Sequence, residues 1–279
     1  MNGQRSEFHY DVKDSSTNAV TALAELSGLS RQRIKMAMQR GAVWLTSRGS
    51  CRRLRRVKKV LRAGDQIDFY YDERVLMSTP IAPTLLADEG TYSLWYKPCG
   101  LLSQGSKWGD HCTVSRWAEQ HLSPQRSSFI IHRLDRAASG LILVGHTKRA
   151  AAALSNLFQS RAIEKCYRVV VHGEFPETAA PFTLSSQIDG KEATSHVTRI
   201  TFDSLQQRSL LSVKIETGRK HQIRRHLSES GHAVVGDRLY GSGEDKEELQ
   251  LTACYLAFKC PLSGQQRRYT LADELLPLL

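Results

Sequence analysis

The sequence His132-Arg133-Leu134-Asp135-Arg136-Ala137-Ala138-Ser139-Gly140 is a polar segment between two apolar runs. Phe129-Ile130-Ile131 precedes it and Leu141-Ile142-Leu143-Val144 follows it. Short continuous apolar runs of this kind are typical of buried strands. The pattern therefore predicts a loop that presents the carboxylate of Asp135, flanked by two arginines, at the edge of a sheet. The simpler interpretation is an Asp paired with its neighbours in a solvated turn. Residues elsewhere in the chain favour a catalytic interpretation.

Positive charge is concentrated in one part of the chain. The 279 residues contain 39 Lys and Arg against 28 Asp and Glu, a net charge of +11. Residues 31–62 hold twelve of these basic residues and no acidic one, so the remainder is close to neutral. Charge concentrated in this way indicates a docking surface for a polyanion such as RNA, and a solvated basic face is the alternative. The candidate RNA contacts in this segment are Arg31, Arg33, Arg52, Arg53, Arg55, Arg56, Lys58 and Lys59.

A membrane surface is the competing partner for a basic protein, and the sequence gives it no support. The first residues are polar and lack the apolar core of a signal peptide, and no run approaches the length that spans a bilayer. The six cysteines form no Cys-x-x-Cys pair and have no His spacing typical of a zinc site. We expect reduced thiols in a cytoplasmic protein, with disulfides as the alternative.

The chain length and local signals predict two domains. Residues 1–77 form the first, with residues 1–17 as a frayed polar leader. Asn18 and Ser30 are candidate N-caps of two short helices, and strands follow near residues 42–45 and 67–71. Residues 78–87, which contain Pro80 and Pro83, are the predicted linker. Residues 88–279 form the second domain, a mixture of strands and helices.

A second dense polar motif, Glu216 to Leu227, reads ETGRKHQIRRHL. Thr217-Gly218 is a predicted turn that leads into a helix, with Arg219 at the helix entrance. Ile223 and Leu227, spaced i and i+4, lie on the inward face and form either a pocket wall or core. A predicted strand at residues 166–171 carries Tyr167, whose alternation alone favours a core tyrosine.

Five motifs, taken together and in order, resemble the RluA family of RNA pseudouridine synthases. They are the HRLD loop, Lys97-Pro98-Cys99-Gly100, Lys165-Cys166-Tyr167, TGRKHQIRRHL and GHAVVGDRLYG, within residues 90–241. The first domain is similar to the small alpha-L RNA-binding module of ribosomal proteins and tyrosyl-tRNA synthetases. Ala138 departs from the family, which usually has Thr there, and residues 101–110 also differ. The resemblance implies an α/β (α+β) fold whose catalytic domain has a mixed, largely antiparallel sheet.

The resemblance also implies roles for individual residues. Asp135 matches the family's catalytic Asp and would be the nucleophile. Arg219 matches the active-site Arg and would form a bidentate pair that keeps the Asp135 carboxylate ionised and aimed. Tyr167 would stack on the target base near the proton that leaves C5. Arg133, with His132 beside it, would contact the RNA and fill the gap left by the flipped uridine.

Isomerisation of uridine involves no redox step and no external energy source, so we expect no cofactor. Large-subunit ribosomal RNA is the favoured substrate and tRNA the alternative, and we expect a monomer. A non-catalytic RNA-binding assembly factor is a second hypothesis. A metal-dependent nuclease is a third, because His132, His221 and His226 could suggest a metal site, but no matching carboxylate cluster accompanies them.

Overall fold

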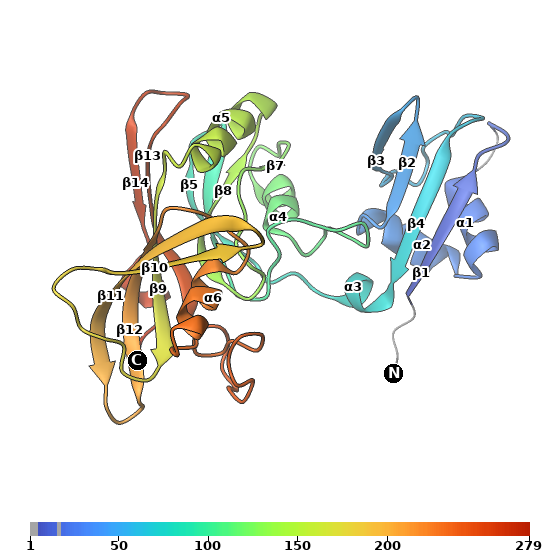
Figure 1. Cartoon of the computed structure of the whole chain (residues 1–279). Coiled ribbons are helices and arrows are strands. Elements are labelled where there is room, and N and C mark those ends of the chain that lie inside the picture. The colour runs from blue at the N-terminus through green and yellow to red at the C-terminus, as the bar shows by residue number, and fades with distance from the viewer. Residues whose placement is uncertain (1–4, 16–17) are drawn as a thin grey trace. The chain divides into compact units, whose positions relative to one another are not determined.

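The structure is a computed structural model that describes residues 5–15 and 18–279. These residues form two compact units, each of which Figure 1 shows as a ribbon. The first unit contains the chain up to Ile81 together with Gln104–Trp117, and the second contains Ala82–Ser103 and Ala118–Leu279. The first boundary falls inside the predicted linker 78–87. Residues 104–117, in contrast, leave the predicted catalytic domain 88–279 and pack with the first unit.

The first unit combines a four-stranded sheet, in the order β1-β4-β2-β3, with helices that share its hydrophobic core. Asn18 and Ser30 cap α1 and α2 by accepting hydrogen bonds from the backbone N–H groups of Val20 and Arg33, as the sequence predicted. The elements are β1 (Arg5–Asp11), α1 (Ala19–Ser27), α2 (Arg31–Gln39), β2 (Val43–Ser47), β3 (Ser50–Arg53), β4 (Gln66–Asp72) and α3 (Glu73–Met77).

The prediction of a frayed leader over residues 1–17 is wrong for Arg5–Asp11. These residues form β1, which pairs antiparallel with β4, and Phe8 stacks on Phe69 with ring centroids 5.6 Å apart. The strand was missed because its partner lies more than 50 residues away and every second residue is polar. Residues 1–4 and 16–17 lie outside the described residues.

The second unit is built on a ten-stranded sheet in the order β10-β11-β12-β9-β13-β8-β6-β5, with β14 on β13 and β7 on β8. Every pairing is antiparallel except that of β13 with β8, which confirms a mixed, largely antiparallel sheet. The elements are β5 (Thr84–Asp88), β6 (Tyr92–Lys97), β7 (Phe129–Ile130), β8 (Ser139–Gly145), α5 (Lys148–Gln159), β9 (Glu164–His172), β10 (Phe182–Ile188), β11 (Lys191–Asp203), β12 (Arg208–Ile215), α6 (Gln222–Glu229), β13 (Leu251–Lys259), β14 (Gln266–Thr270) and η1 (Asp273–Leu275). Helix α4 (Val114–His121) begins in the segment 104–117 of the first unit and ends in the second. The second half of the predicted linker is therefore strand β5.

The parallel pair of β8 and β13 fixes the end of the polar loop 132–140. Gly140 has φ +113°, and a Cβ at this position would collide with the backbone of Ala253 on the neighbouring strand. The hydroxyl groups of Ser139 and Thr252 lie 2.7 Å apart and link the same two strands. The loop thus enters the sheet at a point where only glycine allows the strands to approach.

Candidate active site

Side chains and backbone groups from the turn after β6 hold the loop around Asp135. Lys97 is fully buried, and its ammonium donates to the carbonyl groups of Pro98, Leu101 and Arg136. Burial lowers the pKa of Lys97 to about 8. The Ser103 hydroxyl donates to the Leu134 carbonyl and accepts from the Leu134 N–H, at 2.8 and 3.0 Å. Both neighbours of Asp135 are therefore fixed through their backbone, so the carboxylate projects from a rigid loop.

His132 supports the loop and is not an exposed RNA contact. Its ring stacks on Phe158 at 4.2 Å, and its Nε2 accepts a hydrogen bond from the backbone N–H of Leu143. Burial lowers the pKa of His132 to about 3, with the charge of Lys165 acting in the same direction. A neutral ring that accepts from the backbone fits a structural role better than the RNA contact that we predicted.

This histidine predicts acid sensitivity. Its pKa rises from about 3 in the folded chain to 6.5 when the chain unfolds, so the unfolded chain binds the extra proton. The stabilisation is complete above pH 6.5 and is lost as the pH falls toward 3. We expect this group to lower the free energy of unfolding by up to about 1.4 kcal/mol per pH unit in that range. Urea unfolding of wild-type protein and His132→Gln between pH 7 and 5 tests this, and equal slopes would contradict it.

The partner of Asp135 is Arg224, not Arg219. The Asp135 carboxylate lies 3.5 Å from Arg224 Nη1 and 3.8 Å from His221 Nε2. Arg219 instead donates from Nε to the carbonyl of Glu192 at 3.0 Å, and no ion pair within residues 5–15 and 18–279 joins it to Asp135. The prediction of an Asp135–Arg219 pair is therefore wrong. Arg219 precedes α6, whereas Arg224 lies on the buried face of that helix.

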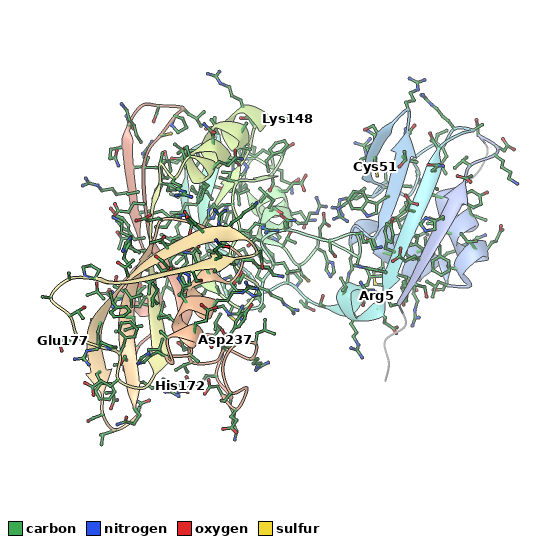
Figure 2. All side chains as sticks on the ribbon, in the orientation of Figure 1. Arg5, Cys51, Lys148, His172, Glu177 and Asp237 are labelled. Atoms are coloured by element: carbon green, nitrogen blue, oxygen red, sulfur yellow. The ribbon has the colours of Figure 1, made fainter. Side chains whose placement is uncertain are left out.

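Arg224 is held by a second carboxylate behind it. Its Nε and Nη2 donate to the two oxygens of Asp237, both at 2.7 Å, and the side chains are 5% and 0% exposed. Asp237, which Figure 2 labels, lies in the loop after α6. Burial acts to raise the pKa of Asp237, but hydrogen bonds from Arg224 and from the N–H groups of Leu239 and Tyr240 outweigh it, so this pKa is lowered. The bidentate pair locks the guanidinium and leaves Nη1 facing Asp135.

Tyr167 and two apolar residues of α6 belong to one hydrophobic cluster near Asp135. Burial, followed by the negative charge of Asp135, raises the pKa of Tyr167, which places the phenol in the field of that carboxylate. The Tyr167 hydroxyl has no hydrogen-bond partner among the described residues, so it is free to meet a ligand. Ile223 and Leu227 are buried in the hydrophobic cluster on which Tyr167 and Ala137 pack. Ala138 is buried in the same cluster.

The sequence interpretation gave His221 no role beside Asp135. His221 has φ 55°, which is an uncommon backbone conformation for a residue with a side chain. Its Nδ1 lies 2.9 Å from the hydroxyl of Tyr240, which also accepts from Arg225 Nε. The positive φ turns the imidazole toward both Asp135 and Tyr240, and functional sites often carry such strain. Only the DRLYG motif, which contains Asp237 and Tyr240, could have signalled this arrangement.

The predicted RNA contacts divide into exposed and engaged side chains. Arg133, Arg31, Arg52, Arg56 and Lys58 are exposed, and Lys59 is partly exposed. Arg33 is about half exposed, donates to the Tyr71 hydroxyl and lies 3.5 Å from Glu73. Arg53 and Arg55 are largely covered and are paired within the first unit. The exposed residues remain candidates for phosphate contact.

Several side chains and helices bear on the alternatives of a metal site, disulfides and a membrane partner. His226 is buried, and its Nδ1 lies 3.0 Å from Ser195 Oγ. Within residues 5–15 and 18–279, no group of three or more His, Cys, Asp or Glu side chains is arranged to hold a metal ion. All six cysteines are free thiols. None of the helices in the described ranges combines the length and hydrophobicity needed to cross a bilayer.

Similarity to known proteins shows the family to which a chain with this site belongs. Residues 91–229 match the family model described as RNA pseudouridylate synthase. The dual-specificity RNA pseudouridine synthase RluA of Vibrio vulnificus is 31% identical over 188 residues, which cover 60% of this chain and 74% of that protein. The chain belongs to the RluA family of RNA pseudouridine synthases. A ribosomal large subunit pseudouridine synthase D of Zymomonas mobilis is 34% identical over 49% of this chain and 50% of its own length.

Other RNA pseudouridine synthases are matched over different shares of their length. An uncharacterised RNA pseudouridine synthase of Chloroflexus aurantiacus is 33% identical, but this chain spans only 54% of it. One from Aquifex aeolicus is 28% identical over 85% of this chain and 83% of its own length. The fold is also similar to that of human RNA pseudouridylate synthase domain containing 1, with a TM-score of 0.60, 22% identity and coverage of 72% of this chain and 88% of that one.

Proposed function

We propose that this protein isomerises uridine to pseudouridine in RNA, with Asp135 as the catalytic carboxylate. The observation that carries the proposal is the position of the Asp135 carboxylate, 3.5 Å from the guanidinium that Asp237 locks and close enough to Tyr167 for its charge to act on that phenol. The guanidinium pairs with the carboxylate, and the aromatic ring offers a surface on which a pyrimidine can stack. We place the protein in the cytoplasm and expect a monomer.

The reaction breaks the bond between C1′ and N1, turns the base and forms a bond between C1′ and C5. The proton on C5 then leaves and N1 gains a proton, so the product is an isomer of the substrate. The Asp135 carboxylate, which is 27% exposed, can attack or stabilise the sugar or the base. We propose that Tyr167 holds the detached base and that Arg133 fills the space of the flipped uridine.

We propose large-subunit ribosomal RNA as the substrate class, because relatives matched by this chain are named for that RNA. The dual-specificity name of the Vibrio relative keeps tRNA as the alternative. The exposed basic residues of the first unit would contact phosphates, which gives salt-dependent binding without sequence specificity. Mapping pseudouridines in ribosomal RNA and tRNA from cells without this protein distinguishes the two classes.

The activity is tested by release of tritium from RNA labelled at C5 of uridine. We expect the wild-type protein to release tritium, to leave the RNA at full length and to keep its activity in the presence of a chelator. RNA binding without release would indicate a non-catalytic assembly factor and contradict the proposal. Shortened RNA and inhibition by the chelator would indicate a metal-dependent nuclease.

A further inference from the structure

The segment Gln104–Trp117 packs on the first unit although the chain before and after it belongs to the second. The Trp44 indole donates to the carbonyl of Lys107 at 3.1 Å. Trp108 meets Tyr70 edge-on at 5.7 Å, and the guanidinium of Arg5, which Figure 2 labels, lies 4.0 Å from its ring. Aromatic and cation–π contacts of this kind add specific attraction to apolar burial.

Asp110 is the charged centre of this contact. Its carboxylate lies 3.0 Å from Arg53 Nε and is also paired with Arg55, and the Asp110 side chain is only 16% exposed. Its backbone N–H donates to the carbonyl of Arg40. Other N–H groups of the same two guanidinium groups donate to backbone carbonyls. Arg53 donates to Gly41 and Ser106, and Arg55 donates to Gln39.

The stability of this charged cluster depends more on Asp110 than on Arg53 or Arg55. Burial lowers the pKa of Arg53, the charge of Asp110 opposes that shift and the neighbouring Arg55 adds to it. Removal of Asp110 would therefore leave two like charges close together in a partly desolvated position. A Cβ at Gly41 or at Gly105 would collide with Asp110, so two glycines make room for it. The site is built around this carboxylate.

The same stretch reaches the loop of Asp135 at its other end. Ser103, the residue before this segment, exchanges two hydrogen bonds with Leu134, and Leu101 accepts from Lys97. Residues 101–110 therefore begin at the backbone of the candidate active site and end at the basic unit. This is the stretch in which the sequence departs from the RluA pattern.

We propose that Arg53, Arg55 and Asp110 form a clasp that fixes residues 104–117 to the first unit, so that RNA bound there is delivered to the Asp135 loop. The inference rests on the proposed function. Arg53 and Arg55 act as positioning residues in this arrangement, while their exposed neighbours Arg52 and Arg56 remain available for phosphates. Because Ser103 is bonded to Leu134 and residues 104–117 are held on the first unit, the clasp shortens the free chain between bound RNA and the Asp135 loop, and a shorter tether raises the local concentration of substrate.

Asp110→Asn in the full-length protein tests the clasp, with Glu25→Gln as a matched control. Both changes remove one negative charge from the first unit, and Glu25 is exposed. Loss of an acidic charge by itself strengthens binding to a polyanion. A clasp predicts the opposite for Asp110→Asn: KM for a large-subunit ribosomal RNA transcript rises about tenfold while kcat is unchanged. A short hairpin that carries the same uridine should be modified as by the wild type.

Hydrogen exchange supplies a readout that does not depend on activity. Amide groups of residues 104–112 should exchange faster in Asp110→Asn than in the wild type, and Glu25→Gln should leave both exchange and KM unchanged. Trp44→Phe, which removes the bond to Lys107 and weakens the cation–π contact with Arg53, should shift exchange and KM in the same direction by about twofold. It serves as the test if Asp110→Asn unfolds the first unit.

The outcomes separate the two proposals. Unchanged exchange in Asp110→Asn, or faster exchange with an unchanged KM for the long transcript, would overturn the clasp while the synthase activity stands. Wild-type protein that releases no tritium from either RNA would overturn the proposed function instead.

Discussion

Asp135→Asn is expected to reduce tritium release from uridine-labelled RNA by at least about 10³-fold. The amide has the shape of the carboxylate but lacks its charge and its nucleophilic oxygen, so it can neither attack nor stabilise a developing positive charge. The backbone of Leu134 and Arg136 is held by Ser103, Gly100 and Lys97, so the loop should keep its position. Single-turnover tritium release with excess enzyme measures the chemical step.

RNA affinity provides the control for this variant. Asp135 repels phosphates, so its neutralisation should leave binding equal to or tighter than that of the wild type. Glu229→Gln, which neutralises an exposed acid on α6, should retain full activity. An Asp135→Asn protein that releases tritium at a wild-type rate would show that the reaction does not pass through this carboxylate.

Arg224→Gln is expected to have the second largest effect, on both activity and stability. Loss of the guanidinium removes the cation next to Asp135 and leaves Asp237 buried without its partner. Breaking a buried ion pair in this way costs roughly 3–5 kcal/mol. We expect at least about a 100-fold loss of tritium release, because the Asp135 carboxylate loses its electrostatic support. Arg219→Gln should cost much less, since Arg219 bonds to the carbonyl of Glu192.

A double variant separates catalysis from stability at this position. Arg224→Met combined with Asp237→Leu removes both buried charges and should recover part of the unfolding free energy that Arg224→Gln loses, because the N–H groups of Leu239 and Tyr240 also lose their acceptor. Activity should stay low, because Asp135 still lacks its cation. Chemical denaturation and tritium release on the same preparations provide both quantities. A larger activity loss in Arg219→Gln than in Arg224→Gln would contradict the structural assignment.

Local signals in the sequence were sufficient for the elements near the site. The predicted caps at Asn18 and Ser30 are fixed by side-chain acceptors two or three residues from the N–H groups that they bind. The apolar runs on both sides of Asp135 form β7 and β8, as predicted. Motif order then identified the family, because each motif lies on a short element whose position depends little on distant residues.

Distant partners account for what the sequence did not reveal. Strand β1 carries alternating polar residues and obtains its order from β4, more than 50 residues away in the chain. The choice between Arg219 and Arg224 also depended on the fold. Ile223 and Leu227 were expected on the inward face of α6, and Arg224 lies next to the first and one turn before the second. That face could have pointed to Arg224, but only the pairing with Asp237 decides it.

The excursion of residues 104–117 makes the two units inseparable as gene fragments. A protein cut between residues 81 and 82 would give an N-terminal piece that lacks Trp108 and Asp110, with Arg53 and Arg55 left uncompensated. The complementary piece would carry residues 104–117 without the surface on which they pack, and the indole of Trp108 would be exposed. Modular shuffling of the front unit onto another synthase would therefore need to transplant this loop as well, because the module boundary in space does not coincide with any single boundary in the gene.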